Sequence, residues 1–126
     1  MESPNWKLED DLKTVTLTFP SSPPVALRLS TTDVDDLLRN LGLFRGAMKP
    51  EIADKFDLGQ KVEAVPDPKW VTEPDILRGD SLLHIRDPRF GWLHYLLPKA
   101  EAEKLANYFL VQIALPTPGL GEGRPN

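Results

Sequence analysis

The sequence of 126 residues predicts an α+β protein, a two-layer sandwich in which one antiparallel sheet of four to five strands carries two main helices on one face. Two observations predict this class. Four segments alternate apolar and polar residues, as half-buried strands do. The 13 prolines leave two long gaps, at 25–49 and 99–115, and proline-free segments of this kind can hold long helices.

The length suits one ordinary domain. We predict an N-terminal arm at 1–12, a single α+β domain at 13–115 and a disordered tail at 116–126, which is rich in proline and glycine. Within the domain, the predicted order is strand, strand, helix, and this order then repeats once.

The first half begins with strands at 14–19 and 25–29, which the short link 20–24 joins as an antiparallel hairpin. The first helix follows directly, because Ser30 and Asp33 have the spacing of a capping box. Its apolar stripe comprises Val34, Leu37, Leu38, Leu41, Phe44 and Met48, and Pro50 ends it.

The middle of the chain gives weaker signals. Residues 50–58 predict a short helix that Gly59 ends, and residues 60–65 predict an edge strand. Three prolines and scattered charges at 66–80 predict an ordered but irregular loop.

The second half predicts strands at 81–86 and 92–97, joined by a turn that contains Pro88 and Gly91. Pro98 suits the first position of the second helix, whose buried stripe is Ala102, Leu105, Ala106, Phe109 and Ile113. Four more apolar residues make the last two turns apolar almost all round: Tyr108, Leu110, Val111 and Leu115. A surface helix of a monomer is not expected to be so apolar, so we predict that its own sheet or a second copy covers this end.

The second hairpin also carries the candidate binding residues, which are His84, Arg86, Trp92 and His94. Their arrangement depends on the register. If the loop holds an odd number of residues, His84 and His94 lie directly opposite each other, with β-carbons about 5 Å apart. An even loop would place the two imidazoles on opposite faces of the ribbon.

Two imidazoles, a guanidinium and an indole can bind an anionic or planar ligand, or transfer protons if a carboxylate orients one imidazole. Four carboxylates of the preceding loop are available: Asp67, Glu73, Asp75 and Asp80. The alternative is that these side chains simply line the solvated face of a sheet. Two histidines and one loop carboxylate could also form a facial metal triad, but no metal-ligand spacing is visible, and we predict neither a metal nor a cofactor.

Composition excludes several classes of function. The chain has no cysteine, so disulfides, thiol catalysis and thiolate zinc sites are excluded. Fifteen basic against 19 acidic residues give a net charge of −4, which weighs against a nucleic-acid partner. We find no apolar run long enough for a membrane span and no secretory signal, and we therefore predict a cytoplasmic protein.

These observations lead to two hypotheses. The first is a small cytoplasmic protein without chemistry of its own, which acts by protein association as a homodimer through Tyr108, Leu110, Val111 and Leu115, or with another protein partner. The second is a small-molecule-binding protein or enzyme whose site on the second hairpin contains His84, Arg86, Trp92 and His94.

Overall fold

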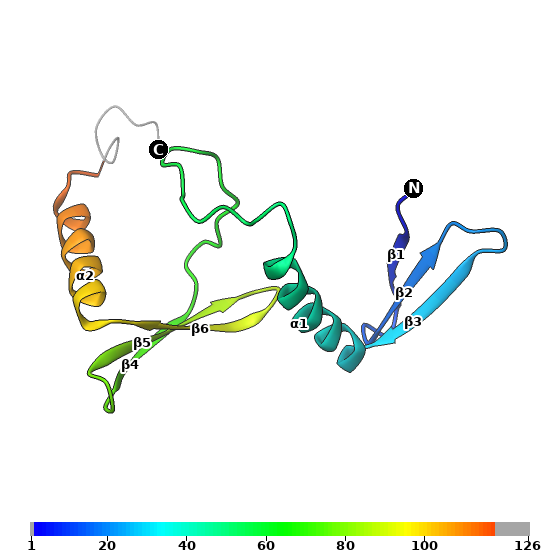
Figure 1. Ribbon diagram of the computed structural model, residues 1–126, viewed down its shortest axis with the longest axis horizontal. Helices are drawn as coiled ribbons and strands as arrows, with labels where there is room; N and C mark the ends of the chain where they lie inside the picture. The colour runs from blue at the N-terminus through cyan, green and yellow to red at the C-terminus, as the bar shows by residue number, and fades with distance from the viewer. Residues whose placement is uncertain (1, 118–126) are drawn as a thin grey trace. The chain divides into compact units, whose positions relative to one another are not determined.

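The computed structural model describes residues 2–117, and these form six β-strands and two α-helices (Figure 1). The chain divides into two compact units, Met1–Gln60 (unit 1) and Lys61–Asn126 (unit 2). Each unit contains one antiparallel three-stranded sheet and the helix that follows it. The elements are β1 (Asn5–Leu8), β2 (Thr14–Phe19), β3 (Val25–Ser30), α1 (Thr31–Ala47), β4 (Trp70–Asp75), β5 (Asp80–Asp87), β6 (Gly91–Leu97) and α2 (Lys99–Ala114).

The sheet of unit 1, sheet A, has the order β1-β2-β3. Trp6, Leu17 and Leu27 pair across its three strands, so they share one face. The same alternation makes this whole face apolar, with Trp6, Leu8, Val15, Leu17, Phe19, Val25, Leu27 and Leu29. Leu17 lies in the central strand and is only 8% exposed. The opposite face carries mainly threonine, lysine and arginine.

Helix α1 starts directly after β3 at the predicted capping box. The backbone N–H of Asp33 donates to the Ser30 hydroxyl at 3.2 Å, and the Ser30 N–H donates to the Asp33 carboxylate at 2.9 Å. The predicted first helix is therefore confirmed. Its apolar stripe remains exposed, however, and Phe44 at its end is 65% exposed.

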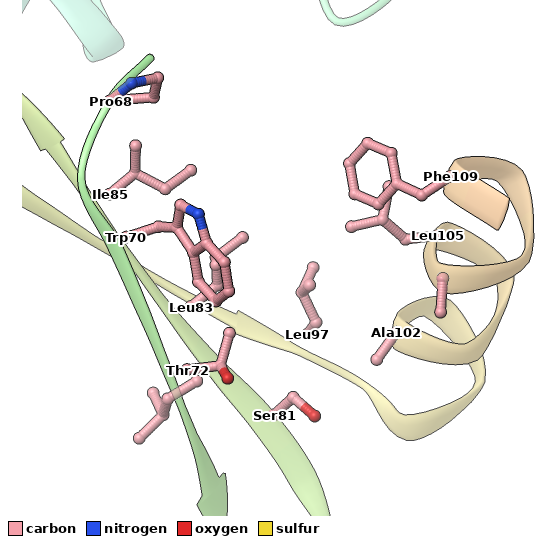
Figure 2. A pocket seen from close by; sticks show the side chains of 12 residues that line it. Pro68, Trp70, Thr72, Ser81, Leu83, Ile85, Leu97, Ala102, Leu105 and Phe109 are labelled. Carbon is pink, nitrogen blue, oxygen red and sulfur yellow. The ribbon is translucent and has the colours of Figure 1, made fainter. Parts of the chain in front are cut away.

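The sheet of unit 2, sheet B, has the order β4-β5-β6. One face carries Leu83, Ile85 and Leu97, and these side chains face Ala102, Leu105 and Phe109 of α2 across an apolar hollow (Figure 2). The first turn of α2 is tied to the sheet, because the Lys99 N–H donates to the Asp80 carboxylate at 3.3 Å. The predicted second helix is confirmed, but its predicted stripe is not buried: Phe109 is 53% and Ile113 is 77% exposed, and only Ala102 and Leu105 are half-buried.

The α+β class and the four predicted strands are confirmed, but the single four- to five-stranded sheet is not. The structure has two sheets of three strands, because each hairpin gains its third strand from the chain just before it. Residues 5–8, predicted as part of an arm, form β1. Residues 70–75, predicted as loop, form β4, and Pro74 is compatible with this because β4 is an edge strand.

Two weaker predictions are wrong. Residues 50–58 form no helix and residues 60–65 form no strand. Only turns and bends are found there, and Gly59 has the positive φ of a turn residue, +85°. Most of the predicted disordered tail, residues 118–126, lies outside the described residues.

Candidate functional site

The hairpin of β5 and β6 fixes the register on which the candidate site depends. Asp87 pairs with Gly91, which leaves the odd loop of three residues, 88–90, and His84 pairs with His94. The turn is held by the Asp87 carboxylate, which accepts from the N–H groups of Arg89 at 2.7 Å and Phe90 at 3.2 Å. Gly91 supplies the positive φ of +76° with which the loop closes. Of the two registers that the sequence left open, the structure has the one that places both imidazoles on one face.

The face of sheet B that carries the histidines is the one opposite α2. Because side chains alternate along a strand, the partners in register form three rows across this face. His84 and His94 lie in the middle row with Val71, Arg86 and Trp92 form the row nearer the hairpin loop, and Leu82 and Leu96 lie in the third row with Glu73.

The two histidines and Glu73 form a continuous chain of hydrogen bonds across all three strands. The Nδ1 atoms of His84 and His94 are 2.8 Å apart, and His84 Nε2 lies 2.9 Å from an oxygen of Glu73. The two rings meet edge to face, with centroids 5.0 Å apart and planes at 72°. The side chain of His84 is 19% exposed, whereas that of Glu73 is 56% exposed. We call these three residues the Glu73–His84–His94 chain.

Hydrogen-bond chemistry sets the protons in this chain. An ionised carboxylate can only accept, so His84 donates from Nε2 to Glu73. A neutral His84 then presents a lone pair on Nδ1, and His94 must donate from its own Nδ1. If His94 is neutral as well, its Nε2, at the far side of the ring, carries no proton. The chain therefore holds His94 as a proton acceptor, in the way that a carboxylate orients a catalytic histidine.

Sequence reasoning named four carboxylates that could orient an imidazole, and in the structure Glu73 bonds to His84. Asp80 instead accepts from the start of α2, and Asp75 accepts from the Leu77 N–H at 3.2 Å in the turn after β4. Glu73 could not be selected from the sequence because its segment was predicted as loop. The available signal was the β-forming run Trp70-Val71-Thr72, which the nearby prolines obscured.

Arg86 and Trp92 pair across β5 and β6 next to the histidines. Arg86 is an exposed residue, and none of the side-chain hydrogen bonds and ion pairs found in residues 2–117 involves its guanidinium. The indole of Trp92 is 41% exposed and borders an open hollow of about 590 Å³. The other residues that line this hollow are Asp67, Pro68, Lys69, Trp70 and Val71. All four predicted binding residues thus lie on one face.

The second candidate surface is α2. Figure 2 shows Leu105 and Phe109 directed toward the sheet, across a hollow of about 560 Å³ that is lined almost entirely by apolar side chains. The four residues predicted as an interface remain outside this layer. Tyr108, Leu110, Val111 and Leu115 are each 60–65% exposed, so α2 is apolar on its outer side as well.

Comparisons with known proteins add no function. No family model, no curated protein and no solved structure matches the chain. Within residues 2–117, there is no group of three or more His, Cys, Asp or Glu side chains that could hold a metal ion. In the same range, neither helix has the length and hydropathy needed to cross a membrane.

Proposed function

We propose that this chain functions by association, as a homodimer whose interface includes the outer side of α2. The exposure of apolar side chains in both units supports the proposal: among residues 2–117, Leu17 is the one hydrophobic residue that is buried. Folded domains gain their stability chiefly from buried apolar surface. Burial against another chain would supply what each unit lacks by itself.

A second copy is the partner we favour because the exposed stripe on α2 suits a twofold axis. Tyr108, Val111 and Leu115 follow one another at steps of three and four residues, which places them along one side of the helix. The stripe carries no charge, so it is complementary to itself. Two antiparallel α2 helices would bring Val111, in the middle of the stripe, against the same residue of the partner.

The size of a stable interface favours a contribution from unit 1. A specific interface buries about 1,000 Å² or more in total, which is more than we expect one stripe of a helix to bury. The apolar face of sheet A offers a second surface, and Trp6 and Leu8 on its edge strand are each 59% exposed. Burial of a leucine-sized side chain stabilises an assembly by about 1.5–3 kcal/mol. We therefore expect this face to be covered in the dimer.

Gel filtration with light scattering tests the proposal. We expect the wild-type chain to have twice its 14.1 kDa mass at micromolar concentration. Val111→Glu places a charge in the middle of the stripe and should shift the chain to monomer, whereas the control Val111→Leu should remain a dimer. A wild-type monomer would contradict the proposal, and a dimeric Val111→Glu variant would remove α2 from the interface.

The Glu73–His84–His94 chain supports a second candidate function, a small-molecule site on the histidine face of sheet B. Polar side chains on a merely solvated face need not bond to one another, but these three do. Two-bond ¹H–¹⁵N spectra of the imidazoles test whether the chain persists in solution. We expect neutral His94 to carry its proton on Nδ1, and a proton on Nε2, as in free histidine, would refute the candidate.

A further inference from the structure

We propose that the histidine face of sheet B binds a small phenol. In this arrangement His94 Nε2 accepts the acidic proton, the Trp92 indole stacks on the ring and the Arg86 guanidinium pairs with the resulting anion. The inference rests on the second candidate function and names the ligand class of that site.

The first argument is the pattern of donors and acceptors. The Glu73–His84–His94 chain leaves a lone pair on His94 Nε2, which repels an oxygen that is already ionised. Arg86, one row away, offers only donors. A phenol hydroxyl complements this pair of groups, because it donates its proton to Nε2 and its oxygen then accepts from the guanidinium. A carboxylate or a sulfonate has already lost its proton at neutral pH and does not complement it.

The second argument is the shape of the surface around His94. Trp92 and Leu96 are two residues away on the same strand, so their side chains flank the imidazole at about 7 Å on either side. The exposed indole offers a flat apolar surface on which an aromatic ring can stack. The indole also borders the open hollow of about 590 Å³, which is otherwise lined by residues 67–71, so the hollow lies beside the position of His94 and Arg86.

The third argument is the charge balance after binding. The O–H bond of the ligand breaks, a bond from Nε2 to hydrogen forms, and no other bond changes. The hydrogen bonds of His84 then connect the imidazolium of His94 to the carboxylate of Glu73, which stabilises the positive charge on His94. The anion gains the unpaired guanidinium of Arg86. Lys69 and Asp67 also line the hollow, and because their charges are of opposite sign they offset each other there.

The experiment uses 4-nitrophenol, whose ionised form absorbs visible light, at a pH where the free probe is mostly protonated. Adding excess protein should increase the phenolate band. His94→Gln should abolish this increase, and Arg86→Gln should weaken binding about tenfold, the effect of losing one charged hydrogen bond. The matched control is Arg89→Gln at the hairpin loop, which removes a guanidinium from the same hairpin and should leave binding unchanged.

Two further comparisons decide the outcome. Glu73→Gln keeps the sheet pairing and tests the chain independently of His94→Gln: the phenolate fraction of the bound probe should fall several-fold. The neutral analogue 4-nitroanisole should bind at least tenfold more weakly than 4-nitrophenol. Equal binding of the two probes, or a phenolate band that survives His94→Gln, would overturn the acid-binding inference and leave the small-molecule site standing. Binding of neither probe would remove both.

Discussion

The two units share an order of elements but differ in what their sheets expose. Each is an antiparallel meander of three strands that runs directly into a helix. The polar face of sheet A carries Thr14, Thr16 and Thr18 on its central strand. The corresponding central strand of sheet B carries Leu82, His84 and Arg86 on the face away from α2. The same scaffold therefore presents short hydroxyls in one unit and titratable side chains in the other.

The polar side chains of the two sheets also differ in the partners to which they are hydrogen-bonded. The hydroxyl of Thr16 donates to Glu9 at 3.3 Å, and Glu9 also pairs with Lys7, so the polar groups of sheet A bond to near neighbours in sequence. The Glu73–His84–His94 chain instead joins three strands and ends on an open acceptor. We accordingly place the candidate ligand site in unit 2 and expect unit 1 to contribute apolar surface.

The largest expected effect concerns the leucines in the central strands of the two sheets. Leu17→Ala should lower the free energy of unfolding of unit 1 by about 2–4 kcal/mol, because it removes the buried side chain of sheet A and leaves a cavity. Leu83→Ala in sheet B should cost less, since Leu83 is only half-buried and faces an existing hollow. Hydrogen exchange resolved by segment measures both units in one sample. Equal losses would show that the two sheets are covered to the same extent in solution.

The fold was predictable wherever one signal sufficed by itself. Alternation over six residues predicted the strand at 14–19, and the capping box predicted where α1 begins. Strand β1 was not predicted because its short segment has only two apolar positions, Trp6 and Leu8. Strand β4 was not predicted because Pro74 argues against a strand unless the strand is already known to lie at an edge.

The sequence predicts residues of the candidate site, but it does not predict the contacts that depend on pairing between strands. The sequence allowed an odd or an even loop, and the structure shows the odd loop at 88–90, which places His84 opposite His94. Glu73 reaches His84 only through the pairing of β4 with β5. The sequence carries no local signal for that pairing, so the choice among four carboxylates required the structure.

The next effect concerns how the two helices begin. Ser30→Ala removes the side-chain cap of α1 and should lower the free energy of unfolding of unit 1 by about 1 kcal/mol. Helix α2 has Pro98 at the same position, with no side-chain cap, so Pro98→Ala should cost only a few tenths of a kcal/mol by comparison. Urea unfolding followed by circular dichroism measures the difference. Equal costs would mean that packing, and not capping, determines the start of α1.

The smallest effect is an unequal response of the two units to acid. In unit 1, the backbone N–H of Lys13 lowers the pKa of Asp11 and that of Ser30 lowers the pKa of Asp33. In unit 2, the N–H of Arg89 lowers the pKa of Asp87. A carboxyl whose pKa is lower in the folded chain stabilises the fold above its unfolded value, here 3.8, and loses this contribution as the pH falls through its folded pKa.

Below about pH 4, unit 1 should therefore lose more stability than unit 2, because it has two such carboxyls against one. The loss in unit 1 should stay below that of Ser30→Ala, since Asp11 and Asp33 are exposed and solvent screens their interactions. Hydrogen exchange of both units between pH 5 and pH 3, corrected for the intrinsic rate, measures it. Asp11→Asn keeps an acceptor for the Lys13 N–H but cannot titrate, so it should reduce the acid sensitivity of unit 1 alone. If the variant lost as much stability as the wild type, the hydrogen bonds of Asp11 would not be the source of the difference between the units.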